Sequence, residues 1–303
     1  MATRGNFASL YGYVQSVNVL PDQNLGLASI VVTRSDRSTG DDKARRVDLI
    51  PVMTNRPEQV LEMMSWEKYD IVETKGVIAT IPNGTKKHVC PHCGQVETTS
   101  GMAAYVYPQF TRRRERFEGD EDSRKNQCAR HLEDNKEVSN IFNCFAYLCR
   151  EPKRKMLNKG LDLTEYQVVI HRAYRIAEDD PEVKEDFVWV KSYGKNGSED
   201  ARKLCVSSQV YIDGLLQSRK VQQKATCSHC GETYTWGDRV LEVVPYAVQY
   251  IKGCLDEEAA TAREEERSRQ QAQSVLATLK GAKTQSSDAF EGIDFGDGMK
   301  VDD

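Results

Sequence analysis

The sequence predicts a mainly β protein built from two similar barrels in tandem, followed by a helix and an acidic tail. Three observations lead to this prediction. Residues 6–14 return in similar form at 140–148, Gly76 corresponds to Gly214 (214 − 76 = 138), and the apolar segments of both halves are short and rich in β-branched and aromatic residues. One long offset indicates two copies of a domain, because the repeats of a solenoid are much shorter.

The first copy, residues 1–110, contains five predicted strands and one helix. The strands are residues 10–17, 28–34, 47–53, 71–80 and 105–110. Residues 57–66 are predicted to be helical, because their apolar side chains recur on one side and Pro57 suits a first turn. Five strands with a helix between the third and the fourth are typical of an OB-fold, a partly open Greek-key barrel.

The second copy, residues 138–254, repeats this order. Its strands are residues 141–149, 166–174, 186–193, 209–218 and 241–244. A short helix is predicted at residues 199–205 and another at 246–254. The sequence therefore predicts two tandem OB-folds. In each, a hairpin between the fourth and fifth strands carries a Cys-x-x-Cys pair, as in a zinc ribbon.

The other segments are polar. Residues 111–137 carry eight bases and eight acids, which predicts a solvated linker between the two folds. Residues 255–280 are rich in Ala, Glu, Arg and Gln and are predicted to form a charged helix, whereas residues 281–303 are predicted to be disordered. Residues 255–303 hold twelve acids and six bases, so the tail is acidic and the rest of the chain is mildly basic. This asymmetry indicates separate tasks for the two parts.

Two segments of the second copy carry a family resemblance. Residues 185–194 read EDFVWVKSYG, and residues 207–220 read SSQVYIDGLLQSRK. An acidic-aromatic strand that ends at an aromatic-Gly pair, then a helix, then a strand of this second form resemble bacterial single-stranded DNA-binding proteins, the SSB family. The likeness covers most of residues 138–250, and the first copy shares it only through the repeat.

The chain departs from that family at several places. Ala146 and Ser207 stand where the family usually has Gly, Val221 stands where it has an aromatic residue, and ordinary members lack the Cys-x-x-Cys insert. The chain therefore resembles a divergent SSB of the kind that a phage or mobile element encodes.

The resemblance implies sequence-independent binding of single-stranded DNA during replication, recombination or repair, without catalysis. Such binding needs aromatic rings on which bases stack and cations that contact phosphates. The expected rings are Tyr174, Phe187, Trp189 and Tyr193. The expected cations are Arg172, Arg175, Lys191, Arg219 and Lys220, with Arg34, Arg45 and Arg46 in the first copy. Leu49 and Asn55 replace Phe187 and Tyr193 in the first copy, which predicts weaker binding there.

The cysteine pairs predict a structural zinc ion. Cys90-x-x-Cys93 and Cys227-x-x-Cys230 are each followed by Gly, as in zinc knuckles, and zinc requires four ligands. Two arrangements remain open: the four thiolates share one ion, or Cys90 and Cys93 bind it with Cys128 and His131. Cys144, Cys149 and Cys205 lie in apolar patterns and are expected to be buried thiols.

The acidic tail alternates acids with Phe290, Ile293 and Phe295. The resemblance implies that such a tail recruits replication or recombination proteins, and a merely solubilising tail is the alternative.

Other functions find less support in the sequence. No catalytic triad order or phosphate-binding Gly loop is present, and Asp48 and Asp186 are interpreted as surface residues at strand starts. No signal peptide or membrane-spanning run is found, and nine cysteines favour the reducing cytoplasm of a bacterial or phage-infected cell. A replisome or primosome scaffold, or a non-catalytic zinc-ribbon subunit of an enzyme, remains an alternative. Homo-oligomers are compatible with the sequence.

Overall fold

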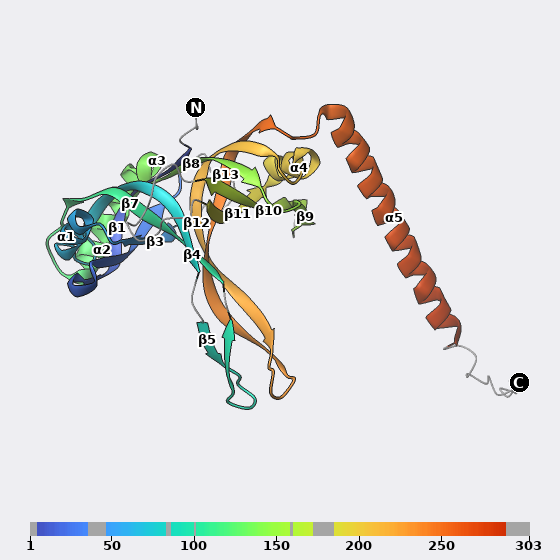
Figure 1. Cartoon of the computed structure of the whole chain (residues 1–303), viewed down its shortest axis with the longest axis horizontal. Coiled ribbons are helices and arrows are strands. Elements are labelled where there is room, and N and C mark those ends of the chain that lie inside the picture. Colours follow the sequence, from blue (N-terminus) through green and yellow to red (C-terminus); the bar gives the residue numbers. More distant parts are fainter. Residues whose placement is uncertain are drawn as a thin grey trace, which may run out of the picture. The chain divides into compact units, whose positions relative to one another are not determined.

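The computed structural model describes residues 5–35, 47–82, 86–99, 101–157, 160–171 and 185–288. Residues 1–254 form one compact unit and residues 255–303 a second (Figure 1). The first unit is almost entirely β, and none of the helices described is both long and apolar enough to cross a lipid bilayer.

Five strands close into the first barrel, which we call barrel one. They are β1 (Asn6–Leu20), β2 (Leu25–Thr33), β3 (Val47–Thr54), β4 (Ile71–Pro82) and β7 (Met102–Glu115). The strands neighbour one another in the order β2-β3-β7-β4-β1, and β1 pairs again with β2 to close the barrel. A short 3₁₀ turn (Pro21–Gln23) joins β1 to β2, and α1 (Pro57–Met64) lies between β3 and β4. This is the predicted OB order.

Barrel two has the same strand order. Its strands are β8 (Asn140–Leu148), β10 (Asp162–His171), β11 (Glu185–Tyr193), β12 (Gln209–Thr226) and β13 (Thr233–Lys252). They run β8-β12-β13-β11-β10, and β10 pairs again with β8. β9 (Lys153–Met156) is added at the edge of β10, and α4 (Gly194–Lys203) lies between β11 and β12. The mainly β, OB-type fold class is thereby confirmed.

The prediction of a helix at residues 246–254 is wrong. Residues 246–252 continue β13 and pair with the start of β12, from Gln209 to Asp213. Their side chains alternate between partly buried and exposed, which is the period of a strand.

The two barrels share one continuous sheet. β1 pairs antiparallel with β8, from Asn6 opposite Cys144 to Leu10 opposite Asn140. The Asn6 side chain bonds the backbone N–H and C=O of Ile78, and Asn140 does the same at Leu216. Because the contacts are equivalent in the two barrels, the junction is pseudo-symmetric.

Asp48 and Asp186, which the sequence analysis placed on the surface, are buried, so that interpretation was wrong. Asp48 is 2 % exposed and accepts from the N–H of Ser218 in barrel two at 3.1 Å. Asp186 is fully buried and accepts from the N–H of Thr80 in barrel one at 2.6 Å. Each carboxylate therefore satisfies a backbone donor of the other barrel, which explains its burial.

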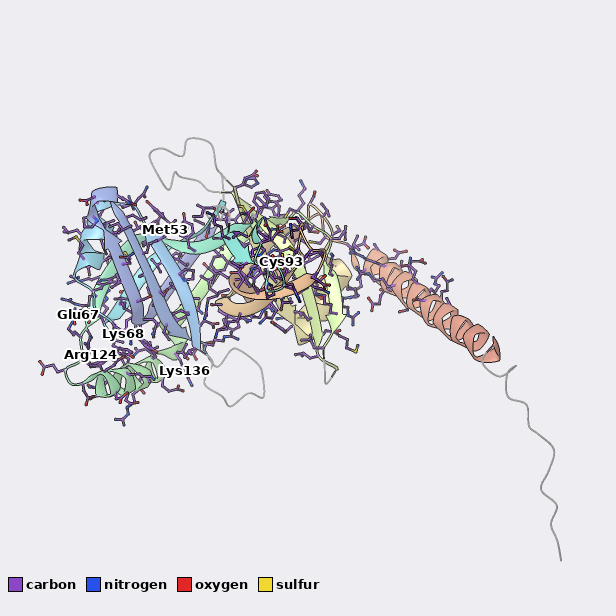
Figure 2. All side chains as sticks on the ribbon, turned by 90° about the horizontal axis from the view of Figure 1, so that it is seen from below. Met53, Glu67, Lys68, Cys93, Arg124 and Lys136 are labelled. Carbon is purple, nitrogen blue, oxygen red and sulfur yellow. The ribbon has the colours of Figure 1, made fainter. Side chains whose placement is uncertain are left out.

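The segment predicted as a solvated linker packs against barrel one. β7 runs on to Glu115, followed by α2 (Glu121–Asp134) and α3 (Lys136–Ser139). Cys128 and Leu132 of α2 are buried. Figure 2 shows Glu67, Lys68 and Arg124 gathered where α2 meets the barrel, and Arg124 approaches Glu67 at 3.7 Å.

The second unit contains α5 (Glu257–Asp288), which confirms the predicted charged helix. The helix ends later than predicted, because residues 281–288, expected to be disordered, continue it. The tail residues Phe290, Ile293 and Phe295 lie outside the described residues.

Candidate nucleic-acid interface and metal centre

An aromatic pair marks the outer face of β10 and β11. Val188 and Val190 point into the core of barrel two, so the alternating residues Phe187 and Trp189 point outward, as predicted. Trp189 is 39 % exposed and Phe187 is partly exposed. Two large rings thus lie next to each other on the face by which OB-folds bind oligonucleotides.

Cations border this pair on the loop between β8 and β10. The Arg150 guanidinium lies over the Trp189 ring, 5.7 Å from its centroid. Lys153, on β9, is exposed, and no ion pair is found for it in the described part of the chain. Neither residue was predicted to bind DNA. The signal was the basic run from Arg150 to Lys155 between the first two strands of the fold, a loop that binds ligands in OB-folds.

Two predicted cations are instead engaged in an ion network. Lys191 is only 7 % exposed, and its ammonium contacts Glu165 and lies 3.6 Å from Glu242. Arg219 donates two hydrogen bonds to Glu242, at 3.2 and 3.0 Å, which raise the pKa of its guanidinium. Burial works to raise the pKa of Glu165, but hydrogen bonds from Lys155 and Lys191 lower it overall. Lys191 is therefore paired within barrel two and is not part of the candidate DNA interface.

The other predicted site residues differ in their surroundings. Arg34 is nearly buried and pairs with Asp48 at 2.7 Å, so it belongs to the barrel junction. Burial raises the pKa of the half-buried Tyr193, whereas Lys220 on β12 is exposed. Five predicted residues lie outside the described parts of the chain: Arg45, Arg46, Arg172, Tyr174 and Arg175.

Barrel one lacks the aromatic pair on its third strand. Leu49 and Pro51 of β3 occupy the places of Phe187 and Trp189, since Leu49 pairs with Val31 as Phe187 pairs with Val169. Asn55, at the place of Tyr193, accepts a hydrogen bond from the Tyr107 hydroxyl at 2.8 Å.

The four knuckle cysteines meet at the tips of two hairpins. One hairpin consists of β5 (Lys86–Val89) and β6 (Val96–Thr99), and the other joins β12 to β13. The two hairpins run side by side, drawn green and orange in Figure 1, and Figure 2 labels Cys93 at the tip. The sulfur atoms of Cys90, Cys93, Cys227 and Cys230 all lie within 4.8 Å of one another.

This donor set fits a single zinc ion. Four thiolates bound tetrahedrally at ~2.3 Å have sulfurs about 3.8 Å apart. The Cys90–Cys230 distance is 3.8 Å and the Cys93–Cys227 distance is 3.6 Å. Burial opposes ionisation of the Cys90 thiol, but hydrogen bonds from the backbone of Cys93 and His92 bring its pKa down to about 7. A backbone hydrogen bond works to lower the pKa of Cys93, but burial and the neighbouring thiols raise it to about 12, as expected when the thiols of one cluster compete for a single negative charge. The turns require positive φ at Gly94 (75°) and Gly231 (74°), where a side chain would be strained.

Contacts beside the cysteines hold the hairpins together. His88 stacks on Trp236 at 4.0 Å between centroids and is hydrogen-bonded to the Tyr234 hydroxyl at 2.7 Å. Glu97 accepts from the N–H and the hydroxyl of Ser228 in the opposite knuckle, at 2.9 and 2.7 Å. Glu97 of the first hairpin therefore holds the cysteine turn of the second, and His88 joins the two hairpins beside it.

The alternative ligand set is not assembled. Cys128 donates to the Tyr69 carbonyl at 3.1 Å, and His131 is hydrogen-bonded to Tyr11 at 2.8 Å. Among the residues that the structure describes, only the four knuckle cysteines cluster as a metal site. Cys144 is fully buried, which raises the pKa of its thiol, and Cys149 and Cys205 are partly buried.

Residues 140–232 match the model of the single-strand binding protein family. Barrel two belongs to the single-strand binding protein family. The matched segment of this SSB domain runs from β8 through the second knuckle, and barrel one lies outside it. The match agrees with the prediction of a binding protein rather than an enzyme.

Solved structures similar to the chain include two of the single-stranded DNA binding protein from Thermus aquaticus. A deletion mutant that also carries a point substitution has 12 % identity and a TM-score of 0.49, and covers 85 % of this chain and 100 % of its own. The wild-type protein has 11 % identity and a TM-score of 0.48, and covers 84 % of this chain and 97 % of its own. No curated protein matches the chain in sequence.

Proposed function

We propose that the chain is a sequence-independent single-stranded DNA-binding protein that coats transient single strands during DNA replication, recombination or repair. The observation that carries this proposal is the pair of outward rings on β11, Phe187 and Trp189, bordered by Arg150 and Lys153. Stacking on such rings contributes ~1–3 kcal/mol per base for any sequence, and the cations supply phosphate contacts. Barrel two is the principal binding domain, and no reaction is catalysed.

The four-cysteine cluster, in this proposal, holds one structural zinc ion shared by the two hairpins. Zinc would bind all four thiolates and link β4 of barrel one to β12 of barrel two through their hairpins. All four ligands come from the chain itself, so no open coordination position remains for catalysis.

Three further features belong to the same proposal. The two barrels descend from a duplication, which their common strand order and reciprocal junction contacts support. The acidic tail recruits replication or recombination proteins in the bacterial or phage-infected cytoplasm. Copies of the chain associate, as two barrels per chain leave outer surfaces for pairing.

The binding proposal is tested by titrating labelled oligo-dT and a duplex of equal length at two salt concentrations. We expect single-strand-selective binding that weakens with salt. The double variant Phe187→Ala/Trp189→Ala removes two stacking rings and should weaken binding at least ~30-fold, or about 2 kcal/mol.

A matched control is Phe110→Ala, since Phe110 is a similarly exposed ring on barrel one. It should leave the affinity unchanged. A wild-type protein that bound neither DNA form at low salt would refute the proposal and favour the scaffold alternative.

A further inference from the structure

The aromatic residues of the first strand pack into a cluster beside α2 in barrel one, whereas Tyr147 on the first strand of barrel two is exposed. Tyr13 on β1 pairs with Val31, and Tyr147 on β8 pairs with Val169, which makes these two tyrosines equivalent. By the same register Tyr11, opposite Glu73, is equivalent to Phe145, opposite Tyr211. The equivalent surfaces of the two barrels can therefore be compared residue by residue.

In barrel one these rings pack against α2 and against residues next to it. Tyr11 is hydrogen-bonded to His131 of α2 at 2.8 Å, and their rings lie 5.6 Å apart. Tyr13 packs on the buried Tyr69 at 5.7 Å between centroids. The rings form one apolar cluster with Phe117 and the buried Cys128. Packed in this cluster, Tyr11 and Tyr13 are only partly exposed.

In barrel two the equivalent rings remain accessible. Tyr147 is 39 % exposed and meets the His171 ring edge-on at 5.6 Å. Phe145 packs on Tyr211 of β12 at 4.8 Å, tilted by 50°, and both are partly exposed. Four rings thus follow one another across the outer surface of β10, β8 and β12.

This row is continuous with the β10–β11 face. Tyr147 pairs with Val169, and Val169 pairs with Phe187, so the three side chains form one line across three strands. Two inter-strand spacings, about 10 Å, separate the Tyr147 and Phe187 positions. A nucleotide chain that stacks on Trp189 and Phe187 reaches Tyr147 by crossing a single strand.

We propose that Tyr147, Phe145 and Tyr211, together with His171, form a second stacking surface for unpaired DNA bases. This second surface depends on the proposed function. It would lengthen the path of the single strand over barrel two. Charge favours DNA as the occupant: Arg150 lies two residues beyond the end of β8, over the Trp189 ring, and Lys153 is exposed on β9. Rings bordered by cations are the typical platform for single strands.

The test compares Tyr147→Leu with Tyr13→Leu in the full chain. Leucine keeps an apolar side chain on the strand and removes the flat ring. With a long oligo-dT, Tyr147→Leu should weaken binding at least about fivefold and shorten the length of DNA that each protein occludes. With an oligo-dT only long enough to cover Phe187 and Trp189, it should have no effect. Tyr13→Leu should change neither value, because the Tyr13 ring packs on Tyr69 and is less exposed than Tyr147.

Photo-crosslinking of the wild-type protein to an iodouracil-substituted long oligonucleotide gives a second readout that needs no variant. We expect a crosslink to the peptide that contains Phe145 and Tyr147. If the Phe187→Ala/Trp189→Ala double variant loses affinity while Tyr147→Leu keeps full affinity and site size, the second surface is refuted and the proposed function stands. A crosslink confined to other peptides would also refute it. So would a change of oligomeric state in Tyr147→Leu at unchanged affinity, since the row would then be a contact between copies.

Discussion

Barrels one and two share a strand order and differ in what lies on it. The cross-strand line is Tyr13, Val31 and Leu49 in barrel one, and Tyr147, Val169 and Phe187 in barrel two. Tyr13 packs in the cluster that includes Cys128 of α2, while Tyr147 is exposed. We propose that this exposed outer face, rather than the barrel itself, makes barrel two the DNA-binding domain.

The face formed by the third, fifth and fourth strands differs as well. In barrel one Met53 packs on a buried apolar group that contains Tyr105, Tyr107 and Val77. In barrel two the places of Met53 and Tyr105 are taken by Lys191 and Glu242, which join Arg219 in an ion network. Barrel one is therefore held together by apolar packing where barrel two uses charges that remain paired.

The largest effect is expected at the four knuckle cysteines, where the two barrels are most alike. If the four thiolates share one ion, Cys93→Ser in barrel one and Cys230→Ser in barrel two should have the same effect. Each should abolish stoichiometric zinc and lower the thermal midpoint by more than about 5 °C, because structural zinc binding contributes strongly to folding. Metal analysis and calorimetry measure both. Cys205→Ser, outside the cluster, should retain one zinc ion per chain.

A finding of two zinc ions per chain, or of one variant that keeps its zinc, would contradict the shared site.

The next test exploits a buried carboxylate of barrel two. Asp200 of α4 accepts hydrogen bonds from Tyr250 at 2.7 Å and Tyr166 at 3.0 Å. Burial raises the pKa of Asp200 from its ordinary 3.8 to about 6. The folded state therefore holds a proton that the unfolded state releases above pH 4, so this contribution to stability is present below pH 4 and is lost as pH rises to 6. At pH 7 the cost is about 3 kcal/mol.

Asp200→Asn should remove this pH dependence. Urea unfolding should show the variant more stable than the wild type at pH 7, by up to about 3 kcal/mol, and similar to it near pH 4. A variant that is less stable at pH 7 would show that the carboxylate's hydrogen bonds outweigh its burial.

The third test compares the two junction carboxylates. Asp186→Ala should cost ~1–3 kcal/mol, because the buried N–H of Thr80 loses its acceptor. Asp48→Ala should also destabilise the protein, since it leaves the Ser218 N–H without its acceptor and the nearly buried Arg34 without its partner. Denaturant unfolding of both variants measures the two costs, and a variant as stable as the wild type would contradict the junction role of its carboxylate.

Local sequence patterns predicted much of the fold and of the candidate site. Alternation predicted the strands and the common face of Phe187 and Trp189, and the repeat of Cys-x-x-Cys at one offset led to the preferred four-thiolate cluster. The predictions that failed concern residues whose partners are distant in the sequence. The buried Asp186 accepts a hydrogen bond from Thr80, 106 residues away, and the buried Lys191 pairs with Glu165 and Glu242. The polar composition of α2 concealed that one of its faces packs on barrel one, and the alternation of residues 246–252 fits a strand rather than the expected helix.

The smallest expected effect comes from grafting the barrel-two rings onto barrel one. Leu49→Phe/Pro51→Trp recreates the aromatic pair on β3, at the places of Phe187 and Trp189. The gain in oligo-dT affinity should not exceed about fivefold, the low end for a single stacked base. The reason is the loop between the first two strands: in barrel one it is the short turn Pro21–Gln23 with an acid, Asp22, whereas barrel two has Arg150 and the basic strand β9. Rings without cations stack bases but leave the phosphates unpaired, so a graft that bound as well as barrel two would show that these cations contribute nothing.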